Sequence, residues 1–145
     1  MSGYLLDTNI IYELIKPQPE PRVVRWVDSV EESLPHLSVL ALGEIEKGIA
    51  SLARASRRAR LEAWLDAELL PRFAGRILPV DEAVARRWGR IAGGLESQSR
   101  VRVPVVDGLL AATAMVHGLV LVTRHAAHVT LTGASVFNPR EDVPF

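Results

Sequence analysis

Cysteine is absent from this chain of 145 residues. A disulfide framework and a thiolate zinc site are therefore excluded, and a reducing compartment is permitted. Lysine is scarce as well, since Lys16 and Lys47 are the only two lysines among seventeen basic residues. The planar guanidinium of arginine suits phosphate and flat bases better than an ammonium group does, although genome base composition explains the bias equally well. The net charge is zero, so no overall field favours a polyanionic partner.

Targeting and membrane-spanning features are also lacking. The opening MSGYLLDTN has neither the basic start nor the apolar length of a signal peptide, so we expect none. From Pro104 to Thr123 the only formal charge is Asp107, and hydropathy alone could mark this stretch as a membrane helix. The His117-Gly118 pair and the LVLV that follows it favour instead a buried helix, a turn and a buried strand. We therefore expect a cytoplasmic protein that does not associate with membranes.

What is present is an alternation of short apolar runs with segments of helical periodicity. A composition of 48% hydrophobic and 23% charged residues is that of a folded chain, and the length suits one domain over residues 1–145. The alternation predicts a parallel sheet with helices on both faces. We expect strands at 3–7, 33–38, 75–80 and 119–123, with 134–137 as a candidate fifth, and helices at about 8–15, 21–30, 39–52, 56–73, 82–94 and 104–117.

Three features define the expected ends of the later helices. Asp81 is expected to cap the helix that follows it, and Gly93-Gly94 to end that helix. Residues 97–103 then form a polar, basic loop, and Pro104 stands in the first turn of the next helix, where proline is favoured.

Asp7 is the first of three acidic residues in places where a charge is unfavourable. It directly follows Tyr4-Leu5-Leu6, at the carboxyl end of the first expected strand, the edge at which open α/β sheets bind ligands. Asp7 could instead cap the following helix, but Thr8 and Asn9 are also suited to that role.

Asp107 is the strongest signal, because it is the lone charge in the apolar stretch described above. Its place in the first turn of a helix stabilises an anion by roughly 0.3–1 kcal/mol. Burial of an unpaired carboxylate costs several kcal/mol, which the helix dipole cannot offset. A bound cation could.

Glu44 lies on an otherwise apolar helical segment, with Glu46 two positions along. Residues two apart point in different directions, so at most one of them faces a site, and a solvated helix face is the simpler explanation for either alone. If Asp7, Glu44 and Asp107 converge, a hard divalent cation would relieve their repulsion and activate a water, and two cations would clamp both reacting oxygens. Their spacing forms no regular motif.

Four segments nevertheless occur together in a familiar order, LLDTNIIYEL, LSVLALGEIEKGI, PVVDGLLAATAMVHGLVLVTR and SVFNP. The set resembles the PIN-domain nucleases of the VapC toxin type over nearly the whole chain, and PQPEPRVVRWVDS and FAGRILPVDEAVA are most similar to the FitB branch. The resemblance implies a single three-layer α/β/α PIN-like domain with a central parallel sheet of four to five strands. It also implies an endoribonuclease that depends on Mg²⁺ or Mn²⁺ and forms the toxin of a type II toxin–antitoxin pair.

The resemblance also assigns roles and partners. Asp7, Glu44 and Asp107 match the catalytic, metal-binding acids, and Asn9 and Thr123 match the positions that orient the acids or their waters. Such toxins pair with a small VapB-like antitoxin whose C-terminal segment blocks the active site. They commonly form homodimers, cleave RNA, and bind DNA only through the antitoxin.

The chain departs from this pattern after the fourth expected strand, where relatives carry a further aspartate. Here the predicted loop has His125 and His128 at the two matching positions. An imidazole could bind a second ion and favour Mn²⁺ over Mg²⁺, the histidines could contact RNA phosphate beside a single ion, or they could have no role. The substitution also leaves an alternative function open, a catalytically attenuated PIN module that binds antitoxin or RNA.

Arginines supply candidate contacts to RNA phosphate. Arg100 and Arg102 precede the helix of Asp107, and Arg124 follows the fourth expected strand, so we expect these three near the site. The clusters within 54–60 and 86–90 are better explained as solvated helix faces. A generic nucleotide-binding domain lacks support, because DTNII stands where a glycine-rich phosphate loop would follow the first strand.

Overall fold

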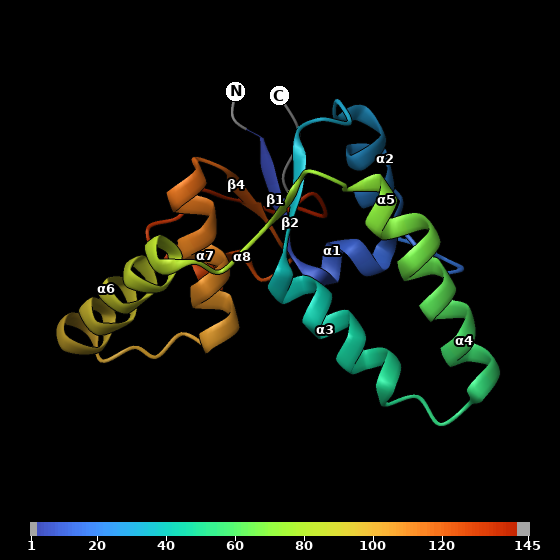
Figure 1. Cartoon of the computed structure of the whole chain (residues 1–145). Helices are drawn as coiled ribbons and strands as arrows, with labels where there is room; N and C mark the ends of the chain where they lie inside the picture. Colours follow the sequence, from blue (N-terminus) through green and yellow to red (C-terminus); the bar gives the residue numbers. More distant parts are fainter. Residues whose placement is uncertain (1–2, 142–145) are drawn as a thin grey trace.

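Five short strands pair in parallel in the order β3-β2-β1-β4-β5, with helices on both sides (Figure 1). The structure is a computed structural model that describes residues 3–141, apart from the side chain of His128. The strands are β1 (Tyr4–Leu6), β2 (Pro35–Ser38), β3 (Ile77–Leu78), β4 (Val120–Val122) and β5 (Val136–Phe137). The helices are α1 (Thr8–Glu13), α2 (Pro21–Ser29), α3 (Val39–Ala50), α4 (Ala55–Trp64), the π-helix η1 (Leu65–Leu69), α5 (Leu70–Arg72), α6 (Glu82–Ser99), α7 (Val105–His117) and α8 (Ala126–Thr130).

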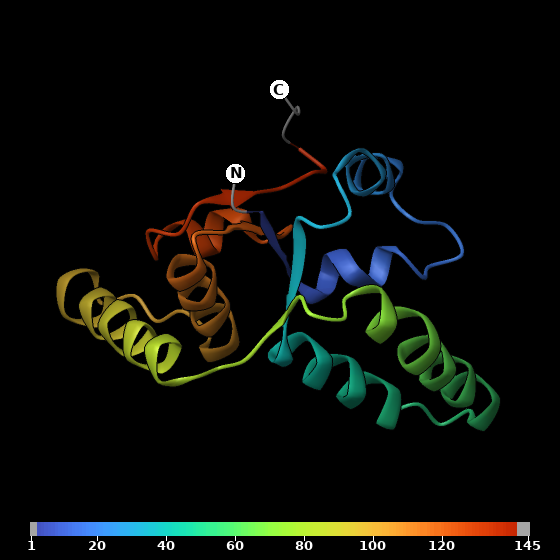
Figure 2. The ribbon, with the colours of Figure 1, turned by 45° about the horizontal axis from the view of Figure 1, so that its top comes forward.

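The two faces of the sheet bury different sets of side chains, because neighbouring residues of a strand point to opposite faces. Leu6, Leu37 and Val122 pack into the core under α1, α2, α3 and η1. Leu5 and Leu121 pack against α7 on the other face. Each fully buried leucine contributes roughly 1.5–3 kcal/mol. Figure 2 shows α6 and α7 on one side of the sheet and α1, α3 and α4 on the other, which confirms the three-layer α/β/α fold.

Two of the expected helix ends are confirmed. The Asp81 side chain accepts a hydrogen bond from the Val84 N–H at 3.0 Å and caps α6. Gly118 adopts the left-handed conformation, φ 66°, that closes α7. Within residues 3–141 no helix combines the length and the apolar character needed to cross a membrane.

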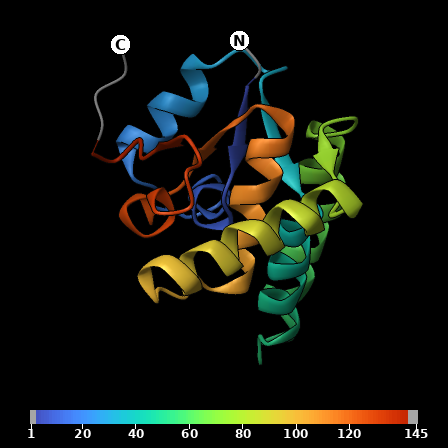
Figure 3. The ribbon, with the colours of Figure 1, turned by 90° about the vertical axis from the view of Figure 1, so that its left-hand side faces the viewer.

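The end of α6 was predicted wrongly. The helix passes through Gly93-Gly94 and ends at Ser99, with Arg100 in the left-handed region at φ 55°. Each glycine disfavours a helix by only about 1 kcal/mol, and α6 lies across α7 on the outside of that layer (Figure 3). Packing against α7 therefore outweighs the local preference of the two glycines, and the predicted loop at 97–103 is shorter.

Two further local features differ from the expectation. The predicted helix at 56–73 widens into the π turn of η1, which ends two residues before Pro71, whose ring would clash with a carbonyl in a regular α-helix. The predicted loop after β4 contains the short helix α8, in which the Thr130 hydroxyl donates to the Ala126 carbonyl at 2.6 Å.

Candidate active site

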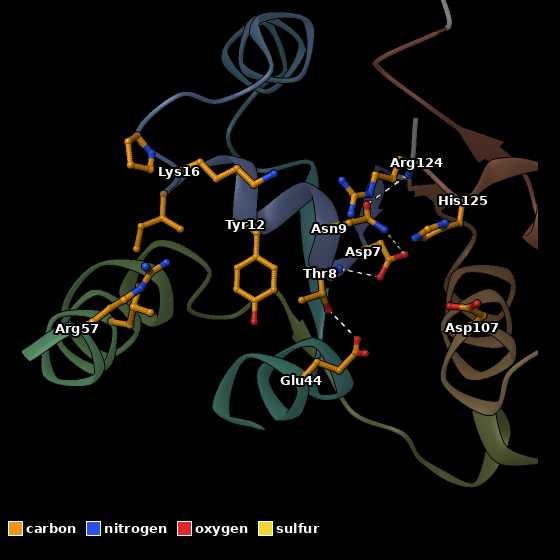
Figure 4. Close-up of a pocket in the computed structure, with 13 residues that line it drawn as sticks. Asp7, Thr8, Asn9, Tyr12, Lys16, Glu44, Arg57, Asp107, Arg124 and His125 are labelled. Atoms are coloured by element: carbon orange, nitrogen blue, oxygen red, sulfur yellow. Dashed lines mark hydrogen bonds between the residues drawn. The ribbon is translucent and has the colours of Figure 1, made fainter. Parts of the chain in front are cut away.

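A cavity of about 820 Å³ opens at the carboxyl ends of β1 and β4 (Figure 4). Asp7 directly follows β1, Glu44 lies on α3, and Asp107 lies in the first turn of α7. All three carboxylates line this cavity, although 100 residues separate the first from the last. The lining residues are Asp7, Thr8, Asn9, Tyr12, Ile15, Lys16, Pro17, Glu44, Arg57, Leu61, Asp107, Arg124 and His125.

Asp7 is held by hydrogen bonds to both carboxylate oxygens. Oδ1 accepts from the Thr8 backbone N–H at 2.7 Å, and Oδ2 accepts from the Thr123 hydroxyl at 2.8 Å and from the Asn9 amide at 3.1 Å. Asp7 is therefore the N-cap of α1, and the expectation that Thr8 or Asn9 would cap the helix was wrong. Capping and a place in the cavity coincide in one residue.

The residues around Asp7 connect it to other elements. The Thr8 hydroxyl donates to Glu44 Oε1 at 2.8 Å, which ties the start of α1 to α3. The Asn9 side-chain N–H also donates to the Thr123 hydroxyl at 3.3 Å, and Asn9 Oδ1 accepts from the Arg124 backbone N–H at 3.3 Å. The start of α1 is thereby fixed against the end of β4.

Glu44 and Glu46 separate as helical geometry requires. Glu44 is half-buried and lines the cavity, whereas Glu46 is exposed. A solvated-face explanation therefore fits Glu46 and not Glu44.

Asp107 is placed by the packing of α7 on α6. A Cβ on the neighbouring Gly108 would lie 2.9 Å from two atoms of the Trp88 indole, so glycine lets the two helices approach. This contact sits at the end of α7 that carries Asp107. The half-buried Asp107 faces the cavity from the side opposite Glu44 (Figure 4).

The electrostatics of the cavity are dominated by acids at its centre. Asp7 is only 6% exposed, and its hydrogen-bond donors within residues 3–141 are neutral. Burial raises the pKa of the Tyr12 hydroxyl, and the charge of Glu44 raises it further. Lys16, Arg57 and Arg124 line other parts of the wall. An acidic centre with cationic walls suits a phosphate that approaches a divalent cation.

Oxygen donors of this kind fit a hard divalent cation in their chemistry. In the described part of the chain, no group of three or more acidic or histidine side chains is arranged to hold one ion as it stands. Mg²⁺ usually keeps several waters and is bound through one or two carboxylates. The arrangement therefore suits a hydrated ion held directly by some of these acids and through water by the others.

The other predicted site residues divide into two groups. Arg124 and His125 line the cavity, whereas Arg100 and Arg102 do not, and Arg102 instead pairs with Glu96 at 3.1 Å. The side chain of His128 lies outside the described part of the structure.

Three polar residues of the cavity wall were missed, Tyr12, Lys16 and Arg57. Tyr12 follows Thr8 by four residues on α1, so helical spacing could have found it. Lys16 lies beyond the end of α1 at Glu13, and helical spacing does not place it. Arg57 carried no such signal, because its position depends on how α4 folds back beside α3.

The chain is similar to known proteins over nearly its whole length. A family model described as PIN domain matches residues 4–128. Toxin FitB of Neisseria gonorrhoeae is 38% identical over 138 residues, which cover 95% of this chain and 99% of that protein. A VapC ribonuclease of Sinorhizobium fredii is 33% identical over 137 residues, covering 94% and 97%. The solved structure of FitAB bound to a DNA fragment is similar with a TM-score of 0.91 and 35% identity, covering 97% and 98%.

Proposed function

Because this chain belongs to the PIN-domain family and is a relative of the FitB and VapC toxins, we propose that it is a divalent-metal-dependent endoribonuclease and the toxin of a toxin–antitoxin pair. The observation that carries the proposal is the meeting of Asp7, Glu44 and Asp107 around one cavity with cationic walls. Two relatives that cover almost the whole chain are named a toxin and a ribonuclease.

The three carboxylates are the residues that would hold Mg²⁺ or Mn²⁺. A bound ion of this kind would lower the pKa of a water and neutralise charge that develops on the phosphate. Asp7 would be the firmest ligand, since three hydrogen bonds fix its carboxylate. Thr8 holds one oxygen of Glu44 and leaves the other oxygen for an ion or its water.

The remaining side chains act on the RNA itself. Arg124 and Lys16 stand on the cavity wall, where cations position a phosphodiester against the acidic centre. Asn9 and Thr123 are positioning residues, because they act through Asp7. Half-buried Tyr12 offers an aromatic ring beside the acids, a surface on which an unpaired base can stack.

The proposed partner follows from the family. A small VapB-like antitoxin would cover the cavity with its C-terminal segment and would provide any contact with DNA. The solved FitAB complex bound to a DNA fragment supports such a pairing. A homodimer of the toxin remains part of the proposal.

The function is tested with total RNA, purified protein and an Asp7→Asn variant, each with Mg²⁺, with Mn²⁺ and with EDTA. Cleavage should require the wild-type acid and be abolished by EDTA. A band pattern that survives both the substitution and the chelator would exclude the metal mechanism.

His125 motivates a second candidate, a PIN module that binds RNA or antitoxin with little turnover. It lines the cavity at a position where the family resemblance predicts an acid. This candidate predicts RNA binding without cleavage in either metal, and activity gained by His125→Asp. Cleavage by the wild-type protein would exclude it.

A further inference from the structure

A second cavity, of about 280 Å³, lies beside the acidic one. It is lined by Arg22, Arg124, His125, Asn138, Arg140 and Glu141. The three arginines come from separate segments, the start of α2, the turn after β4 and the turn after β5. Folding therefore gathers three guanidinium groups that are far apart in the sequence.

The two cavities share a wall. Arg124 and His125 line both of them. Figure 4 shows Arg124 beside Asn9, next to Asp7, and His125 between Asp7 and Asp107. A chain that leaves the acidic centre past these two residues enters the second cavity.

Positive charge prevails in the second cavity. The three arginines line it together with one acid, Glu141. A second acid, Glu20, stands nearby and pairs with Arg22 at 3.0 Å. The guanidinium groups of Arg124 and Arg140 make no hydrogen bond to any residue within 3–141, so their donors are available to an anion. Hydrogen bonds from Arg22 lower the pKa of Glu20, and the charges of Arg22 and Arg140 lower it further.

The segment that carries Arg140 is anchored. The Arg140 backbone N–H donates to the Asn138 side-chain oxygen at 3.0 Å, and Asn138 is only 3% exposed. Arg140 itself is half-buried. This arginine therefore belongs to a formed wall, unlike a freely extended surface side chain.

We infer that the cavity of Arg22, Arg124 and Arg140 binds a phosphate of the RNA chain next to the phosphate that is cleaved. Guanidinium forks bind phosphate oxygens in pairs, which fixes the direction of the backbone as well as its affinity. The inference rests on the proposed nuclease function, since it assigns a subsite to that substrate. Through Arg124, the subsite would set the register of the RNA over Asp7.

A different arginine cluster provides the matched control. Arg86, Arg87 and Arg90 line a groove on α6 together with Val116, near the end of α7 away from Asp107. That groove shares no lining residue with the acidic cavity. If any loss of positive charge weakened RNA binding, substitutions in the two arginine clusters would therefore weaken it equally.

The first measurement is equilibrium binding of a short single-stranded RNA in EDTA, so that no cleavage occurs. The Arg22→Gln/Arg140→Gln variant should raise the Kd about tenfold, the effect of losing a charge-assisted hydrogen bond. The salt dependence, log K against log salt, should become shallower by about 0.7 for each phosphate contact removed. The Arg86→Gln/Arg90→Gln control should bind within about twofold of the wild type. Equal binding by the two variants would overturn the inference.

The second measurement places the phosphate. Neutral methylphosphonate linkages are introduced one at a time along the same RNA, whose cleavage point has been mapped with the wild-type protein. A neutral linkage adjoining the cleavage point should weaken wild-type binding as much as the arginine substitutions do, and should have no further effect on the variant. Equal losses in both proteins at every linkage would refute the subsite, and so would an effect that depends only on a 5′-terminal phosphate.

Failure of the proposed function would look different from failure of this inference. If the proposed nuclease function is wrong, the wild type and the Arg86→Gln/Arg90→Gln control would both bind RNA without cleaving it in Mg²⁺ or Mn²⁺. If instead the wild type cleaves and the Arg22→Gln/Arg140→Gln variant has unchanged KM and kcat, the nuclease stands and the subsite is wrong.

Discussion

Removing the Thr123 hydroxyl should loosen Asp7 without changing the shape of the core. Thr123 is fully buried, and its Oγ1 donates to Asp7 Oδ2 at 2.8 Å while it accepts from the His125 N–H at 3.0 Å and the Asn9 amide at 3.3 Å. Thr123→Val replaces this hydroxyl with a methyl group. A hydrogen bond to a charged group contributes roughly 1.5–3 kcal/mol, and a neutral one about 1 kcal/mol. The free energy of unfolding should therefore fall by about 2–4 kcal/mol.

Thr123→Ser is the matched control, because it keeps the hydroxyl and loses only a buried methyl group, at about 1 kcal/mol. Urea unfolding at pH 7 in EDTA measures both variants without a contribution from metal. Titration with Mn²⁺ then measures the metal affinity of each variant. Substitution of a residue that orients a metal ligand typically weakens metal affinity about 10–100-fold. The valine variant should show that loss and the serine variant should not. Valine and serine variants of equal stability and equal Mn²⁺ affinity would refute the role given to this hydroxyl.

Three further substitutions test other parts of the account. Glu44→Gln should lower the cleavage rate by about 100-fold or more, whereas exposed Glu46→Gln should stay within about twofold of the wild type; equal rates would contradict the assignment. Burial raises the pKa of Glu13, but hydrogen bonds from Lys16 and a backbone N–H, with the charges of Lys16 and Arg124, lower it overall. The ionised Glu13 carboxylate therefore stabilises the folded state fully above the unfolded pKa of 4.5, and this stabilisation is lost as the pH falls through the lower folded pKa. In urea unfolding, Glu13→Gln should lower the free energy of unfolding by about 1–2 kcal/mol at pH 7 and by progressively less below pH 4.5. Gly108→Ala puts a Cβ 2.9 Å from the Trp88 indole and should lower the free energy of unfolding by about 1–3 kcal/mol, although alanine favours a helix more than glycine does. A Tm above that of the wild type would contradict the close packing of α6 on α7.

The fold was predictable because its signals are local. Strands with short apolar runs, such as the one ending at Leu6, alternate with amphipathic helices, and this alternation specifies a parallel sheet. Asp7 was singled out by its place at the carboxyl end of the first expected strand, and Asp107 by the cost of burying a carboxylate. That these two acids converge with Glu44 was implied only by the family resemblance, because their spacing forms no regular motif. Both residues line the cavity.

The errors at the end of α6 and in the cavity wall come from packing between separate helices. The glycines at 93 and 94 weaken a helix locally, but the contact of α6 with α7 carries the helix five residues further, to Ser99. At 1.5 Å per residue, that extension moves the following turn by roughly 8 Å. Arg100 and Arg102 follow it and do not line the cavity. The place of Arg57 in the wall depends on the return of α4 and has no local signature.

The most direct test of the central claim is the anomalous scattering of Mn²⁺ in crystals of this protein. We expect a manganese peak inside the cavity, bound to the Asp7 carboxylate, with Glu44 and Asp107 reaching the ion directly or through one water. Asp7→Asn should remove the peak. Manganese bound elsewhere, or unchanged binding in the Asn variant, would contradict the claim that these three acids share a cation.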